Sequence, residues 1–164
     1  MGADGITTSC GFLSLFQEEL SAALRVPVVT SSLMQVAMVN ATLPRGKTCG
    51  VLTISGDTLT EQHLSAANVP PGTPVGTTEG LRTFTRTILK DELELDVSAA
   101  REDNVEAAMK LVRDHPQVGA IVLECTNMIP YAPAIQQAVG LPVYSMVSLI
   151  NWFQSGLQPK NFMA

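Results

Sequence analysis

Apolar and polar positions alternate along this chain with two different periods. Short runs rich in β-branched residues have the length of buried strands, and between them apolar residues recur every three or four positions, as on a helix with one buried face. Clusters containing proline and glycine, at residues 44–46 and 70–74, separate these segments. The pattern is typical of βα units on a parallel sheet, and it predicts an α/β fold.

The same pattern predicts where the elements lie. We expect strands at residues 6–8, 27–29, 49–54, 75–77, 120–124 and 142–145. We expect helical segments at residues 12–24, 34–39, 60–67, 105–112, 130–139 and 147–154. The stretch 81–97 follows neither period clearly, so no element is predicted there.

One sequence frame occurs twice. Cys10 lies 17 positions before Pro27, and Cys125 lies 17 positions before Pro142, so the two segments align at an offset of 115 without gaps. The identical pairs under this offset are Ile6 with Ile121, Ala23 with Ala138, Pro27 with Pro142, and Val28 with Val143. Internal duplication accounts for this match; the alternative is that all βα units share apolar periodicity. A duplication predicts a thiol at the carboxyl end of a parallel strand in each half, where open α/β sheets bind ligands.

Two of the three cysteines lie in polar surroundings. Cys10 follows Thr7-Thr8-Ser9, and Cys125 lies between Glu124 and Thr126-Asn127, whereas Cys49 begins an apolar strand and is expected in the core. A thiol at a helix N-terminus feels the positive end of the helix dipole, which predicts a pKa lowered toward neutrality. Such a thiol exchanges between thiolate base and thiol acid near neutral pH.

Two thiols that face each other across a cleft suit proton transfer at a carbon next to a carboxylate. One thiolate removes the proton and the other thiol returns one to the opposite face. Backbone N–H groups after each cysteine, with the Thr126 hydroxyl and the Asn127 amide, would stabilise the enolate. Glu124 either orients and tunes Cys125 or points away from it, because side chains alternate along a strand.

Composition and charge exclude several other classes. The 164 residues suffice for one compact domain or two small interlocked lobes, and the net charge of −5 with scattered basic residues argues against nucleic-acid binding. No apolar run reaches the roughly 18 residues that a membrane-spanning helix needs, which argues against a membrane protein. An odd number of cysteines without a CxxC pair disfavours a disulfide framework or zinc ribbon, and favours the reduced thiols of a cytoplasmic protein.

Other cysteine chemistries do not fit the spacing. A phosphate-binding Cys-x5-Arg loop would need arginine where Phe16 and Tyr131 stand. A Cys–His hydrolase needs an imidazole beside the thiol, and the two histidines fit structural positions better. His115 precedes a proline at a helix end, and His63 lies in a helix after the Gly56 turn. No glycine-rich nucleotide loop is present, and nothing indicates a metal site.

Two segments resemble the cysteine motifs of the aspartate/glutamate racemase superfamily. These are Gly-Ala-Asp-Gly-Ile-Thr-Thr-Ser-Cys-Gly-Phe at residues 2–12 and Ile-Val-Leu-Glu-Cys-Thr-Asn-Met at residues 121–128, and residues 49–58 are similar to the strand and loop that open the family's second lobe. The resemblance covers most of the chain. It implies two pseudo-symmetric flavodoxin-like lobes with parallel sheets, a substrate between them, no pyridoxal phosphate or metal cofactor, and frequent dimers.

The resemblance also implies roles for individual residues. Cys10 and Cys125 would be the acid/base thiols. The residues that would bind the substrate or lie near its carboxylate are Ser9, Gly11, Thr126, Asn127, Ser55 and Thr58. We expect residues 1–46 with 142–164 to form the first lobe and 47–141 the second. Family members carry at least one βα unit before the first cysteine strand, so the first lobe is expected to be N-terminally truncated.

The sequence therefore predicts a cytoplasmic, homo-oligomeric racemase or isomerase that acts on a small carboxylate-bearing substrate without a cofactor. One alternative within the superfamily is a decarboxylase or cis–trans isomerase with a single nucleophilic or proton-donating cysteine. Another is a non-catalytic module that binds small anions. The family includes amino-acid and hydantoin racemases, maleate isomerases and arylmalonate decarboxylases, so the resemblance leaves these outcomes open.

Overall fold

The computed structural model describes residues 2–162, and strands alternate with helices along the whole chain. The strands are β1 (Ile6–Thr7), β2 (Val28–Val29), β3 (Thr48–Thr53), β4 (Val75–Thr77), β5 (Val118–Leu123) and β6 (Val143–Tyr144). The α-helices are α1 (Gln17–Ala23), α2 (Val36–Thr42), α3 (Glu61–Ala66), α4 (Phe84–Leu89), α5 (Val97–Asp114), α6 (Ala132–Val139) and α7 (Met146–Leu157). Short 3-10 helices lead into α1, α2 and α6; they are η1 (Gly11–Phe16), η2 (Ser32–Gln35) and η3 (Thr126–Tyr131).

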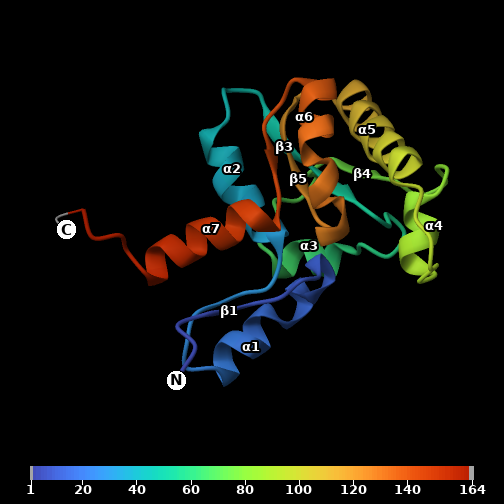
Figure 1. The fold of residues 1–164 in the computed structure, drawn as a ribbon. Helices are drawn as coiled ribbons and strands as arrows, with labels where there is room; N and C mark the ends of the chain where they lie inside the picture. Colours follow the sequence, from blue (N-terminus) through green and yellow to red (C-terminus); the bar gives the residue numbers. More distant parts are fainter. Residues whose placement is uncertain (1, 163–164) are drawn as a thin grey trace.

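All strand pairs are parallel and form two sheets. β1 pairs with β2, and a second sheet has the order β4-β3-β5-β6. The predicted α/β fold with parallel sheets is confirmed. Figure 1 shows β1 and α1 at the bottom of the view, away from α5 and α6, which lie beside β5.

Helices cover both faces of the larger sheet. Successive side chains along each strand point to opposite faces, so each strand contributes to both layers of the core. Leu52, Ile121 and Leu123 point to the face covered by α5 and α6, where they pack in one buried cluster. Val51 and Val122 point to the opposite face, where they pack with buried residues of α2 and α3. The sheet is therefore the middle layer of three, which is why its strands are almost continuously apolar.

Residues 142–157 divide between the two sheets. Strand β6, expected in the first lobe, instead pairs with β5, because the chain leaves β5, crosses through α6 and returns beside the strand it left. Helix α7 covers the two-stranded sheet, where its residues Met146 and Leu149 pack with Val29. The division of the chain into two lobes stays a prediction.

Helix α4 lies in the stretch for which no element was predicted. Its first turn is held by Asp103 of α5, whose carboxylate accepts hydrogen bonds from the backbone N–H groups of Arg82, Thr83 and Phe84 at 3.0, 2.8 and 2.9 Å. A cap supplied from 20 residues away leaves no local signal in the sequence. Within residues 2–162, no helix combines the length and apolarity needed to cross a membrane.

The sequence repeat reappears in the strand register. Ile6 lies opposite Val28 in one sheet, and Ile121 lies opposite Val143 in the other, each pair shifted by the same 115 residues. The N–H of Ile6 donates to the carbonyl of Pro27 at 2.9 Å, and that of Ile121 donates to Pro142 at 2.9 Å. The equivalence of the two segments thus holds at the level of individual hydrogen bonds.

Candidate active site

The two cysteines occupy the same place in the two repeated segments. Cys10 immediately precedes η1 and Cys125 immediately precedes η3, each with an extended backbone. The carbonyl of Cys10 accepts from the N–H of Leu13 at 3.1 Å, and that of Cys125 accepts from Met128 at 3.1 Å. Each thiol therefore lies two or three residues after the end of its strand, and a 3-10 helix begins directly after it.

The two cysteine loops contact each other. The Thr126 hydroxyl donates a hydrogen bond to the carbonyl of Ser9 at 2.7 Å, so the residue after one cysteine binds the residue before the other. On the matching side, Gly11 packs against Glu124: a Cβ added to Gly11 would lie 2.1 Å from Oε1 and 2.6 Å from the carbonyl oxygen of Glu124. Only glycine allows this approach, and the two contacts are related by the 115-residue offset.

The environments of the two thiols differ. Cys10 is exposed, whereas Cys125 is only partly accessible. Burial raises the pKa of Cys125 to about 11, and the charges of Glu124 and Cys10 add to that rise. Hydrogen bonds from the backbone and side chain of Asn127 oppose it.

The expectation that a helix N-terminus lowers the pKa of this thiol is wrong for Cys125. The N–H of Asn127 does favour the thiolate, as a helix start should. Desolvation acts in the opposite direction and is the larger effect, because η3 and β5 pack Cys125 against the core. The extent of that burial depends on tertiary packing and is not visible in the local sequence.

Glu124 lies between the two cysteine loops, with its Oε1 against Gly11. Its side chain is buried, accepts a hydrogen bond from the Thr53 hydroxyl at 2.9 Å, and accepts a second from the N–H of Ile54. Burial raises the pKa of this carboxyl to about 7. The carboxyl group contacts Thr53 and Gly11, and its charge also acts on the pKa of Cys125.

The loop after β3 binds one of the chain's own carboxylates. Ser55 is buried and its hydroxyl donates to Glu79 at 2.7 Å, and the N–H groups of Gly56 and Asp57 donate to the same carboxylate at 2.6 and 3.2 Å. These bonds lower the pKa of Glu79, although its desolvation acts against them. In this conformation the Ser55 hydroxyl is engaged by Glu79, while Thr58 further along the loop is exposed.

A hollow of about 630 Å³ adjoins the contact between the cysteine loops. It is lined by both partners of the bridging hydrogen bond, Ser9 and Thr126, and by apolar side chains of η3 and α7 that include Ile129 and Met146. Because the Thr126 hydroxyl donates to Ser9, its oxygen remains able to accept but not to donate. Asn127 is exposed at the start of η3, and Gly11 is buried.

The remaining cysteine and both histidines occupy structural positions, as predicted. Cys49 is fully buried and its pKa is raised to about 12 by burial. His63 closes a capping box with Thr60 at the start of α3, and its ring packs edge-on against Phe12 at 5.1 Å. His115 is the C-terminal cap of α5. Within residues 2–162, no three His, Cys, Asp or Glu side chains are grouped to hold a metal ion.

Two supporting residues were not predicted from the sequence. Ser32 of η2 donates to the carbonyls of Leu123 and Glu124, at 2.6 and 3.2 Å, and so fixes the end of β5 just before Cys125. Gln17 of α1 binds the carbonyl of Val28 and accepts from Thr30, which ties η1 and α1 to β2. Both are small or neutral polar residues whose partners lie 11 to 92 positions away, so no local motif marks them.

Solved structures share this fold at low sequence identity. An allantoin racemase from Pseudomonas fluorescens superposes with a TM-score of 0.65 at 21% identity, covering 99% of this chain and 67% of its own. Unliganded arylmalonate decarboxylase gives a TM-score of 0.62 at 18% identity, covering 98% of this chain and 70% of its own. These likenesses confirm a racemase-like α/β fold.

Curated relatives are longer proteins. Dimethylsulfoniopropionate lyase 5 of Emiliania huxleyi (strain CCMP1516) is 30% identical over 162 residues, which is 94% of this chain and 32% of the relative. A dimethylsulfoniopropionate lyase of Durusdinium sp. clade D is 26% identical over 162 residues, which is 94% of this chain and 53% of the relative. The chain thus spans about a third to a half of the length of these relatives. The family model for Asp/Glu/hydantoin racemase matches residues 1–152, and the chain belongs to this family of enzymes.

Proposed function

We propose that this chain carries the site of a cofactor-independent enzyme that removes a proton from a carbon next to a carboxylate, with Cys10 and Cys125 as acid and base. The supporting observation is the direct contact of the two cysteine loops. The Thr126–Ser9 hydrogen bond and the Gly11–Glu124 contact hold both thiols at the ends of parallel strands, on facing loops. In this arrangement one thiolate removes the proton from the substrate carbon, while the second sulfur lies on the opposite face of that carbon.

The electron pair left on carbon delocalises into the carboxylate and needs hydrogen-bond donors. The N–H groups that follow Cys10 and Cys125 and the exposed Asn127 amide are the donors available, while Ser9, Thr126 and Thr58 supply polar atoms around them. The Ser55 hydroxyl would join them only when Glu79 releases it. No lysine or arginine contacts these loops through an ion pair in the described part of the chain, so neutral donors would carry carboxylate recognition.

The intermediate then has two fates. In racemisation or isomerisation, the expectation from the sequence, the opposite thiol protonates the other face of the carbon. In the reverse reaction the two sulfurs exchange their roles as base and acid. In β-elimination, the electron pair forms a carbon–carbon double bond and expels a leaving group from the next carbon. For a 3-dimethylsulfonio-propionate the carbon–sulfur bond breaks, sulfur keeps the electron pair, and acrylate, dimethyl sulfide and a thiol-bound proton result.

Two observations favour elimination as the second candidate. The curated relatives described above are named dimethylsulfoniopropionate lyases. The two thiols are also unequally buried, which suits a reaction with one base better than a reversible exchange between two equivalent bases. Decarboxylation, which needs one proton donor, remains an alternative that the fold of arylmalonate decarboxylase supports only at the level of architecture.

A proton-exchange assay in deuterated water separates these outcomes. We expect the chain to introduce deuterium next to the carboxylate of its substrate, tested over amino acids, hydantoins, dicarboxylates and dimethylsulfoniopropionate, with dimethyl sulfide followed in the gas phase. Cys10→Ser and Cys125→Ser should each lower the exchange by about 10²–10⁴-fold, and Cys49→Ala, at a buried cysteine outside the site, should keep it. Ligand binding without deuterium uptake or product would contradict the proposal and indicate a small-anion binding module.

A further inference from the structure

Two acidic side chains are buried in the described part of the chain, and they are satisfied in different ways. Asp103 forms an ion pair with Arg82 at 3.1 Å and accepts three backbone hydrogen bonds. Glu124, which is 1% exposed, has the Thr53 hydroxyl and one backbone N–H as donors, and no ion pair within residues 2–162. A buried carboxylate without a positive partner destabilises a fold, so its place beside the thiols calls for a role.

The position of Glu124 connects it to both thiols. It is the residue before Cys125, and its Oε1 lies against Gly11, the residue after Cys10. The carbonyl of Glu124 is held by Ser32 and its N–H donates to Leu52 at 2.8 Å, so the backbone on which the side chain stands is fixed. The carboxyl group therefore fills the space between the two cysteine loops and the end of β3.

We propose that Glu124 is a positioning residue that assigns the two thiols their roles: its carboxylate, held between Gly11 and Thr53, disfavours a second negative charge on the neighbouring Cys125 sulfur. Cys10 then serves as the thiolate base and Cys125 as the proton-bearing acid. This inference rests on the function proposed above, because roles exist only where both thiols act on one substrate. Under this assignment, the Cys10 sulfur is the one that removes the proton from the substrate.

The charges in the site agree with this assignment. Burial raises the pKa of Cys125 to about 11, and the charge of Glu124 raises it as well. Burial also raises the pKa of Glu124 to about 7, so its own ionisation changes near neutral pH. The titratable groups acting on Cys125 are Glu124 and Cys10. On the adjoining elements, His63 of α3 packs on Phe12 and Tyr131 of η3 packs on Phe84, and Arg101 acts on Tyr131.

Site-resolved alkylation of the native chain and of Glu124→Gln tests the assignment without any substrate. Iodoacetamide labelling, quantified for each cysteine by peptide mass mapping, reports the thiolate fraction at each pH. Glutamine keeps the size of the side chain and removes its charge. At about pH 8, where a group of pKa about 7 is mostly ionised, we expect Cys125 to react about tenfold faster in the variant, the change that one pKa unit produces.

The pH dependence distinguishes a charge effect from a structural one. Below about pH 6 the native Glu124 is neutral like glutamine, so the difference between the two proteins should disappear. A difference of the same size at every pH would indicate altered packing and would overturn the assignment, as would equal rates at pH 8. Glu79→Gln is the matched control: Glu79 is also held by a hydroxyl and by backbone N–H groups but does not touch either cysteine, so the rate at Cys125 should not change.

A second variant covers the case in which Glu124→Gln does not fold. Thr53→Val keeps the side-chain shape and removes the hydroxyl that stabilises ionised Glu124. The pH at which Cys125 labelling changes slope should then move upward, and an unchanged profile would contradict the role. Because labelling needs no turnover, a shift in these profiles with no substrate exchange would refute the proposed function and the assignment of catalytic roles, while the effect of Glu124 on the ionisation of Cys125 would still be established.

Discussion

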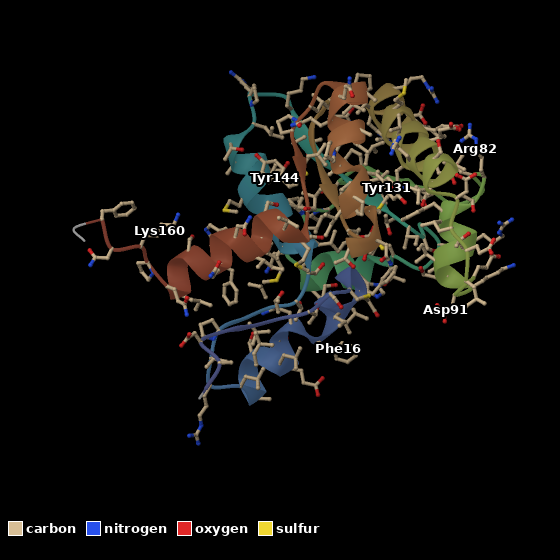
Figure 2. All side chains as sticks on the ribbon, in the orientation of Figure 1. Phe16, Arg82, Asp91, Tyr131, Tyr144 and Lys160 are labelled. Atoms are coloured by element: carbon tan, nitrogen blue, oxygen red, sulfur yellow. The ribbon has the colours of Figure 1, made fainter. Side chains whose placement is uncertain are left out.

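The Cys10 half and the Cys125 half have the same backbone and different surroundings. Strand register, the Ile6 and Ile121 hydrogen bonds, and the 3-10 turn after each cysteine all repeat at an offset of 115 residues. The last residues of the two 3-10 helices show the contrast: Phe16 is 46% exposed, whereas its counterpart Tyr131 is 5% exposed and packs edge-on against Phe84. Figure 2 shows Phe16 low in the view and Tyr131 higher up, beside α6.

The difference comes from the sheets rather than from the cysteine loops. β5 lies between β3 and β6 in a sheet covered on both faces, while β1 pairs with β2 alone among the described strands. The thiol at the end of β5 is therefore desolvated, and the thiol at the end of β1 faces solvent. A repeated local structure can thus carry two chemically identical groups and still expose one while burying most of the other.

The largest effects are expected from removing either thiol. If both sulfurs act on one carbon, Cys10→Ser and Cys125→Ser should each lower α-proton exchange by about 10²–10⁴-fold, the range that general acid–base catalysis supplies. Circular dichroism should show unchanged folds. If one variant kept full activity, only one half would contribute to the chemistry, and the comparison between halves would lose its functional meaning.

A methyl group at position 11 tests how tightly the halves meet. Gly11→Ala places Cβ within 2.1 Å of the buried Glu124 carboxyl, so we expect the free energy of unfolding to fall by about 3 kcal/mol. Gly156→Ala in α7 is the control, because an added Cβ there meets nothing within 4 Å and alanine favours a helix. Chemical denaturation of both variants measures the difference, and equal stabilities would mean that the loops do not touch.

Glu124 should make the stability of the fold depend on pH. Its folded pKa of about 7 lies above its ordinary value of 4.5, so its contribution to stability is complete below about pH 4.5 and is lost as pH rises through 7. We expect the stability of Glu124→Gln relative to the native chain to increase by roughly 3 kcal/mol as the pH rises through that range. Urea denaturation at a series of pH values measures this, and a constant difference would place the charge outside the core.

The smallest effect is expected from the bridging hydrogen bond. Thr126→Val keeps the shape of the side chain and removes the hydroxyl that donates to Ser9 at 2.7 Å. Since both residues are at least partly accessible to water, we expect a loss of about 1 kcal/mol in the free energy of unfolding. Thr58→Val, on an exposed loop position, should change stability less. If Thr126→Val lowered the free energy of unfolding no more than Thr58→Val does, the Thr126–Ser9 hydrogen bond would not stabilise the contact between the two halves.

The sequence predicted those features that depend on local pattern. The strands around Cys49 and Ile121 and the repeat that pairs Cys10 with Cys125 were visible because apolar periodicity and spacing are local. Helix α4 was missed because its cap, Asp103, comes from another helix. The direction of the Cys125 pKa was predicted wrongly because burial depends on the packing of β5.

The predicted site residues divide in the same way. Ser9, Gly11 and Thr126 lie at the contact between the cysteine loops, because their positions follow from the strand ends, and Asn127 hydrogen-bonds to Cys125 within its own loop. Ser55 lies at the expected strand end, yet its hydroxyl binds Glu79, a residue 24 positions away that no motif connects to it. Their roles toward a substrate stay predictions.

The central claim is that two sulfur atoms share one site, and a short thiol-bridging reagent tests it most directly. Treatment with dibromobimane, followed by digestion and mass mapping, should yield one bridged peptide pair that joins Cys10 to Cys125, with Cys49 unmodified in the folded chain. Separate modification of Cys10 and Cys125, without a bridge between them, would contradict the claim.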